Sequence, residues 1–258
     1  MFGELLGREW RDRRWSSLAL GLVIGLMGVF IFSITAGLSD SIARLTHGFP
    51  PAVTAFIGGG SAGGYAVGEL FNLIAPAAMV GYAVVVGGAV IAGEEEKGTM
   101  SILVAQPVTR GSILASKSLA LLAGLVGATV LLWVGVVISS ATYKIGLDVG
   151  GLTAICVHLL FLAIAFAAIA IAVGALTGKP GVATGVAATI AIAAYASNAM
   201  LPLAKLGDWA KLSPWYYFAG SNPLTNGIDG WHLLVLAAIT IVFVVLAAIG
   251  FTRRDLKG

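Results

Sequence analysis

The chain has 258 residues, of which 59% are hydrophobic and only 10% are charged, and its formal net charge is +3. A soluble globular domain carries roughly 45–50% apolar and about 25% charged residues, so this composition excludes a water-soluble fold. The apolar residues come in runs of about twenty, the length of helix that crosses about 30 Å of hydrocarbon. We therefore expect an all-α integral membrane protein, because helices satisfy their own backbone hydrogen bonds in lipid.

The chain begins with an amphipathic segment that precedes the first apolar run. In residues 1–15, apolar side chains recur near one face at helical spacing, while most arginines lie elsewhere; the apolar residues are Phe2, Leu5, Leu6 and Trp10. This pattern predicts a helix that lies in the membrane interface. Six apolar runs follow and are the expected transmembrane helices: 16–38, 67–92, 118–141, 151–176, 182–203 and 231–251.

Basic residues indicate how these spans are oriented. An even number of spans places both termini on one side of the membrane. Four of the 15 Lys and Arg residues fall on the other side, and they are Arg44, Lys144, Lys205 and Lys211. The remaining 11 lie with the termini, which predicts that both termini are cytoplasmic and that the protein sits in the cell membrane. Small-residue pairs four apart predict close helix contacts, within the chain or with a second copy. They are Gly21/Gly25, Gly124/Ala128, Ala170/Gly174 and Gly181/Gly185.

The second span carries two polar residues, Glu69 and Asn72, in its outer third. A carboxylate within a span is costly, which makes this pair a candidate intramembrane polar site. The alternative is that Glu69 lies at headgroup level and is solvated. The sequence leaves both interpretations open.

The inner loop 93–117 has a pattern of its own. An acidic run, Glu94 to Glu96, ends the second span and Gly98 breaks the helix. Residues 100–105 are apolar enough for a short helix, which Pro107 stops because the residue before a proline disfavours the α region. Thr109 then suits the N-cap of the next helix. The loop thus predicts a short helix across the cytoplasmic mouth, flanked by charge, where a soluble partner would dock.

The outer segment 204–230 is rich in aromatic residues. They either form an interfacial belt or act as an outer gate above an exit path. The cluster consists of Trp209, Trp215, Tyr216, Tyr217 and Phe218.

Several chemistries find no support. The glycine-rich stretch 58–64 lacks the Gly-Lys-Ser/Thr of a phosphate-binding loop. His47, His158 and His232 have no metal-ligand spacing. The single cysteine, Cys156, suggests a small packing residue. We expect no catalytic residue, cofactor or metal in this chain, and no nucleic-acid partner.

The inner loop resembles that of the ABC-2 type of ABC-transporter permease, the transmembrane subunit of a type V exporter-like transporter. The residues that fit the family pattern in order are Glu94, Glu95, Glu96, Lys97, Gly98, Thr99, Pro107, Val108, Thr109, Arg110 and Lys117. Segments 212–217, 221–227 and 251–256 also resemble the family, and the six-span layout extends the resemblance over the whole chain.

The resemblance implies a permease that moves its substrate, by export, with ATP and Mg bound in separate ATPase subunits. It also implies pairing with a second copy or a homologous permease. Glu94 to Lys97 and Thr99 would make polar contacts with the ATPase subunit, and Met100, Ile102 and Leu103 would enter its apolar groove. Gly98, Pro107 and Arg110 would shape the coupling loop.

An ATP-independent secondary carrier or channel is the alternative. Such a protein calls for charged or unwound positions near the midplane, which are scarce in this chain.

Overall fold

The computed structural model describes residues 2–38, 62–100 and 108–254, and within these ranges it contains helices and no strand. Six helices are long and apolar enough to cross a membrane, which confirms the expected fold class. The long helices are α1 (Phe2–Gly37), α5 (Ala75–Ala89, continuing α4 and η1), α8 (Arg110–Thr142), α9 (Val149–Thr177), α10 (Pro180–Met200) and α14 (Gly230–Arg253). The short ones are α4 (Ala62–Glu69), η1 (Leu70–Ile74), α6 (Ala92–Glu96), α11 (Gly207–Ala210), α12 (Pro214–Ala219) and α13 (Pro223–Asn226).

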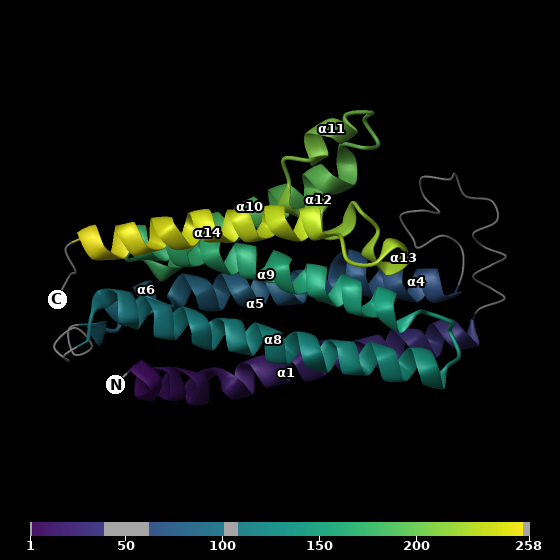
Figure 1. Ribbon diagram of the computed structural model, residues 1–258, viewed down its shortest axis with the longest axis horizontal. Helices are drawn as coiled ribbons and strands as arrows, with labels where there is room; N and C mark the ends of the chain where they lie inside the picture. Colours follow the sequence, from purple (N-terminus) through teal and green to yellow (C-terminus); the bar gives the residue numbers. More distant parts are fainter. Residues whose placement is uncertain (1, 39–61, 101–107, 255–258) are drawn as a thin grey trace.

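The long helices form an elongated bundle (Figure 1). The start of α1, α6, the start of α8 and the end of α14 lie together at one end of it. We call this the inner end, following the predicted orientation, and the opposite one the outer end. Both ends of the described chain lie at the inner end, as an even number of spans requires.

The N-terminal segment does not form a separate helix. Residues 2–37 form one uninterrupted helix, about 54 Å long at about 1.5 Å per residue. The chain offers no proline or glycine between Gly7 and Gly21 that could bend it. Ser16 and Ser17 donate to the carbonyl groups of the preceding turn, so they do not interrupt it either. The expected interfacial helix at 1–15 is thus the first part of α1, and its position in the interface remains a prediction.

Glycines bring α1 and α8 into backbone contact. A methyl group added at Gly25 would lie 3.0 Å from the carbonyl oxygen of Leu131, and one at Gly135 would lie 2.9 Å from that of Gly25. Gly21 and Gly124 face the partner helix as closely. These small residues therefore serve packing within the chain, whereas Gly181 on α10 faces open space.

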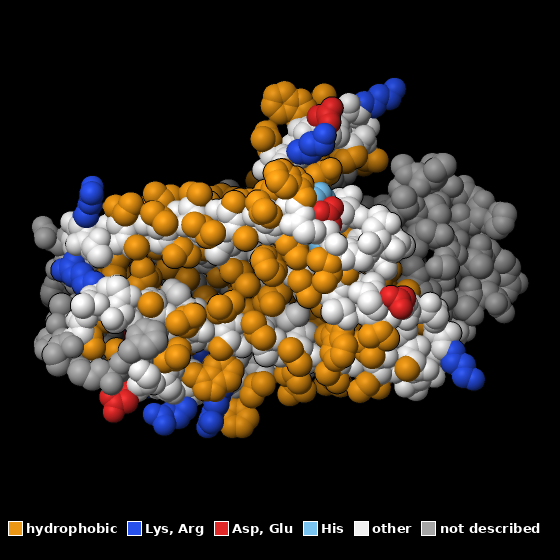
Figure 2. Space-filling view, in the orientation of Figure 1, with side chains coloured by type: hydrophobic (Ala, Val, Ile, Leu, Met, Phe, Trp, Pro, Cys, Tyr) orange, Lys and Arg blue, Asp and Glu red, His pale blue; other side chains and the backbone are white. Residues whose placement is uncertain are grey.

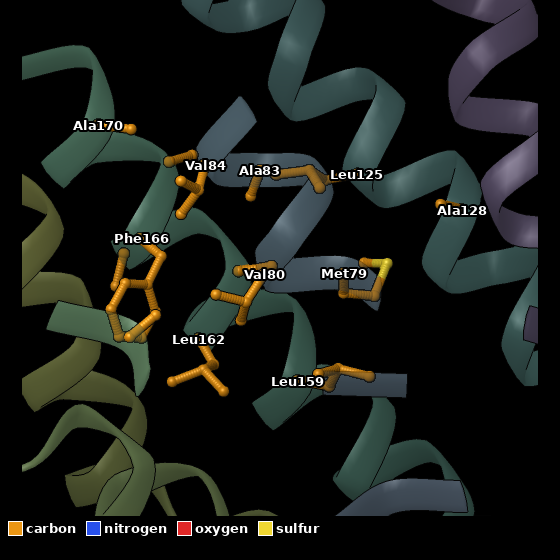
Figure 3. Packing of buried hydrophobic residues seen from close by; sticks show 14 of the residues in the cluster. Met79, Val80, Ala83, Val84, Leu125, Ala128, Leu159, Leu162, Phe166 and Ala170 are labelled. Carbon is orange, nitrogen blue, oxygen red and sulfur yellow. The ribbon is translucent and has the colours of Figure 1, made fainter. Parts of the chain in front are cut away.

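The second span contains a wide turn that its apolar pattern did not predict. In η1 the amide of Ala75 donates to the carbonyl of Leu70, five residues back, so this turn is a π-helix. Pro76 follows at once and has no amide hydrogen to give to the turn before it, which favours the wider register. Beyond it, α5 packs mainly against α9 and α10, and Met79 and Val84 lie among the buried side chains in Figure 3.

The body of the molecule presents an apolar surface. In Figure 2 hydrophobic side chains cover the visible face between the two ends. Large exposed examples include Phe30 on α1, Ile138 on α8 and Ile241 on α14. Such a surface suits lipid hydrocarbon and is too extensive for a soluble monomer.

Replacing Gly135 by Leu should separate α1 from α8 and destabilise the bundle by about 1–3 kcal/mol, because the added side chain meets backbone atoms. Gly181→Leu is the matched control, since nothing lies within 4 Å of an added Cβ there. Thermal unfolding in detergent measures both variants. Equal losses in the two would contradict the assigned packing.

Candidate functional site

The inner end carries a short helix, α6, just after the second span. The helix ends at Glu96, and Gly98 follows with a φ of +71°. The amide of Gly98 donates to the carbonyl of Glu95, and the amide of Thr99 donates to that of Glu94. This is the Schellman arrangement, in which a left-handed glycine satisfies the last carbonyls of a helix. The predicted helix-breaking role of Gly98 is confirmed.

Lys117 joins α6 to two other helices. Its side chain, on α8, is only 2% exposed. The ammonium lies 2.5 Å from a carboxylate oxygen of Glu9 on α1 and 2.9 Å from one of Glu94 on α6. The hydroxyl of Thr99 also donates to the Glu94 carboxylate. A lysine buried to this degree needs such partners, because desolvation of an isolated charge is costly.

A second ion pair ties α6 to the end of α14. Glu95 binds the guanidinium of Arg254, and this pair lies directly over Gly178 in the turn between α9 and α10. Gly178 has a φ of +66° and leaves no room there for a side chain. Arg110 adds to the contact by donating to the carbonyls of Phe251 and Arg254 at 3.1 and 2.9 Å. A cation at the C-terminus of a helix also suits the helix dipole.

Glu94 is the residue whose charge this network controls most clearly. Burial alone would raise its pKa. Hydrogen bonds from Thr99 and Lys117, together with the positive charges of Lys117 and Lys97, outweigh burial and lower the pKa of the carboxyl below 4.5. Glu94 is therefore ionised at neutral pH and held as an anion within the network.

The predicted docking residues do not share one environment. Glu94 and Glu95 are bound within the chain, whereas Glu96, Lys97 and Gly98 are exposed. Met100 is 1% exposed and belongs to the chain's own core, so in this structure it is not presented to a partner groove. Ile102, Leu103 and Pro107 lie outside the described residues. Further on, Thr109 caps α8 by accepting the amide of Ser112, as predicted.

The outer aromatic residues are packed into the bundle more deeply than a surface belt requires. Trp215 and Phe218 on α12 are buried, while Trp209 on α11 is exposed. The ring of Trp215 packs against Phe166 on α9 and Tyr195 on α10, with distances between ring centroids of 6.0 and 5.4 Å.

Ser213 begins α12 and fixes it to α10. Its hydroxyl caps the helix by accepting the amide of Trp215, and it donates to the carbonyl of Ala194. The short helix is therefore anchored at its first turn as well as through its rings.

Two histidines that are distant in sequence meet beneath this segment. The ring centroids of His158 on α9 and His232 on α14 lie 6.4 Å apart. Tyr216 and Tyr217 pack against His232, with centroid distances of 5.4 and 5.2 Å. Asp229 caps α14 by accepting the amides of Trp231 and His232. This cluster was not predicted from the sequence. The available signal was a histidine in an apolar run, since a buried polar side chain requires partners.

Glu69 and Asn72 lie three residues apart along the second span, in different helical elements. Glu69 is exposed at the end of α4, and Asn72 lies within the π turn η1. Wide turns of this kind are frequent at functional sites, which keeps the pair a candidate.

An apolar groove of about 310 Å³ runs between α5 and α10. Its lining includes Val80 and Val84 from α5 and Thr184 and Ala188 from α10. Trp215 of α12 also lines it, so the groove reaches the outer aromatic segment.

Replacing Lys117 by Met should remove the cation shared by the half-buried carboxylates of Glu9 and Glu94, and Arg13 would remain the ion-pair partner of Glu9. We expect a loss of about 1–3 kcal/mol in the free energy of unfolding, followed as the midpoint of thermal unfolding in detergent. Neutralising both partners as well, in Lys117→Met/Glu9→Gln/Glu94→Gln, should recover most of the loss. A triple variant as unstable as Lys117→Met alone would show that packing, and not charge, is responsible.

Acid should remove the contribution of Glu94 in a defined direction. Because its folded-state pKa lies below the ordinary value of 4.5, its stabilisation is present above that pH and is lost as pH falls through the lower folded value. The midpoint of thermal unfolding, measured from about pH 7 to about pH 3, should fall more steeply below pH 4.5 in the unmodified protein than in Glu94→Gln. The exposed neighbour variant Glu96→Gln should follow the unmodified protein. Parallel curves for all three would contradict this assignment.

Comparison with known proteins assigns the chain to a family. No curated protein matches it significantly. A family model described as "ABC-2 family transporter protein" matches residues 5–256, which includes every element at both ends of the bundle. The six apolar helices and this match over nearly the whole chain agree, and the protein belongs to the ABC-2 family of transporter membrane proteins, as a multi-pass permease component.

Proposed function

We propose that the chain exports its substrate with energy from ATP hydrolysis. The ATP and Mg would be bound in separate ATPase subunits that dock at the inner end. The observation that carries this proposal is the connection of α6 to α1 and α8 through Lys117, and to α14 through Arg254. A displacement of α6 by a partner would reach three spans at once. The family membership supports a partner of this kind.

The docking surface would consist of the exposed residues Glu96, Lys97 and Gly98. Glu94 and Glu95 would act one step behind it, because their carboxylates bind Lys117 and Arg254 within the chain. Docking and transmission would thus use different residues of the same acidic run. This division refines the sequence interpretation, in which all three glutamates met the partner.

The working unit would contain two permease chains, either two copies or a homologous pair, in the cell membrane with both termini in the cytoplasm. The basic residues at the inner end, among them Arg14, Lys179 and Arg253, support that orientation. The groove between α5 and α10 has an almost wholly apolar lining, which favours an apolar or amphiphilic cargo. The segment from α11 to α13 would close the outer side, with Trp215 at the end of the groove.

Co-purification from detergent with a candidate ABC ATPase subunit tests the proposal. Exchanging the exposed charges, in Glu96→Lys/Lys97→Glu, should weaken recovery of the ATPase by about tenfold, equivalent to about 1.4 kcal/mol. Lys117→Met should still bind the ATPase where the variant folds, and should lose the coupling of ATP hydrolysis to transport. Asp208→Lys/Lys211→Glu is the matched control, because it exchanges an exposed ion pair on α11 and its flank.

Each outcome of this experiment is informative. ATPase binding that survives the exchange at 96 and 97 would move the docking surface elsewhere on the inner end. Absence of any complex with the folded, unmodified chain would count against the ATP-driven mechanism and favour the secondary carrier.

A further inference from the structure

His158 is a buried polar residue whose hydrogen bonds fix its protonation state. It lies on α9 and is 0% exposed. Its Nε2 atom is 3.2 Å from the backbone amide nitrogen of Asp229, and its Nδ1 atom is 3.2 Å from the carbonyl oxygen of Tyr217. A backbone amide can only donate, so Nε2 must accept and carries no proton. Nδ1 then holds the ring proton and donates to Tyr217, and the ring is neutral.

These two hydrogen bonds hold the outer segment to α9 at two points. Tyr217 belongs to α12, and Asp229 is the cap from which α14 begins. Either hydrogen bond alone would hold only α12 or only the start of α14. Together they fasten α12 and the start of α14 to the same ring on α9.

His158 is the polar contact among three that seat the outer segment on one face of α9. Seven residues before it, Gly151 receives the carbonyl of Leu224 so closely that a methyl group there would overlap it. Eight residues after it, Phe166 contacts Trp215. Spacings of seven and eight place all three on one side of a helix. The contact at Gly151 is a close backbone approach and the contact at Phe166 is ring packing, whereas the contact at His158 depends on a proton.

The groups around His158 determine what a second proton would do. His232 of α14 lies at 6.4 Å between ring centroids, the Asp229 carboxylate lies on the same cap, and Tyr216 and Tyr217 face the cluster from α12. A proton on Nε2 would set two donors against each other, the ring N–H and the Asp229 amide. It would also place a cation beside His232. Both amides are accepted by Oδ1 of the Asp229 carboxylate, and its Oδ2 lies 3.8 Å from Nε2 of His232, so this carboxylate is already engaged by the start of α14.

We propose that His158 is a positioning residue of the outer segment: its neutral ring holds α12 and the start of α14 closed against α9, and uptake of one proton at Nε2 releases them. This inference rests on the proposed role of the outer segment as a closure. An acidic outer medium then favours the released form and a neutral or alkaline medium favours the closed form, since a proton shifts the equilibrium toward the state that binds it better.

Distance measurement between two spin labels tests the proposal without any ATPase or cargo. Cys156 is replaced by Ser, and labels are attached at Thr142→Cys on the outer end of α8 and Thr225→Cys on α13. Both sites are exposed. The labelled chain is diluted with unlabelled chain so that distances within one chain dominate. Distance distributions are then recorded at about pH 8 and about pH 5, on either side of the ordinary titration range of histidine.

The unmodified His158 background should give one short distance at the higher pH and a dominant longer population at the lower pH. His158→Gln keeps an acceptor and a donor but does not titrate, so it should give the short distance at both. His232→Gln is the matched control from the same cluster and should retain the response. His158→Phe, where it folds, should give the longer population at both pH values.

Three results would overturn the proposal. They are an unchanged distribution in the His158 background, a response that persists in His158→Gln, or a response abolished by His232→Gln, which would make His232 the group that titrates. Because the measurement needs only the permease, a negative result leaves the ATPase co-purification to decide the proposed function separately.

Discussion

The ammonium group of Lys117 lies between carboxylates of two other helices, and the arrangement of the inner end depends on that contact. A lysine on a membrane helix is stable only when it is paired or reaches water. Here its burial forces Glu9 of α1 and Glu94 of α6 to converge on it, which fixes the position of α6 relative to both spans. The neighbouring pair of Glu95 and Arg254 follows from the same placement, because α6 then points its next carboxylate at the end of α14.

Close packing of α1 and α8 at glycine residues allows Glu9 and Lys117 to meet. Gly25 and Gly135 let α1 and α8 touch backbone to backbone, so Glu9 and Lys117, near the inner ends of those helices, come within direct reach. Larger residues at the glycine positions would separate the helix axes. The ion pair would then lose its geometry although neither of its residues had changed. In lipid, where burial of apolar surface does not drive helices together, such close approach is a main source of affinity between them.

Local chemistry was predictable from the sequence, and long-range contacts were not. The six spans, the cap at Thr109 and the helix end at Gly98 follow from residue types and spacing, and the structure has them. The partner of Lys117 on α1 is 108 residues away, and no periodicity points to it. The continuity of α1 was missed because an amphipathic pattern describes a surface helix and the exposed part of a longer span equally well.

Other misses have the same origin. The π turn at η1 results from a proline that the apolar pattern alone does not reveal. The aromatic residues of α12 resembled a surface belt, because composition does not tell whether a ring faces lipid or another helix. Only the tertiary fold places Trp215 against Phe166 and His158 against Tyr217 of α12.

The two ends of the bundle are connected by one helix. Of the most apolar stretch of α9, 72% is buried within the chain, against 17% for α14, so α9 is enclosed by other helices. Its inner end meets the Glu95–Arg254 pair at Gly178, and its outer part carries Gly151 and His158 under the outer segment. A packed helix moves as a rigid body more readily than it deforms. A shift imposed at α6 would therefore reach the outer contacts along α9, and a released outer segment would in turn alter the position that α9 prefers, since coupling between two binding equilibria acts equally in both directions.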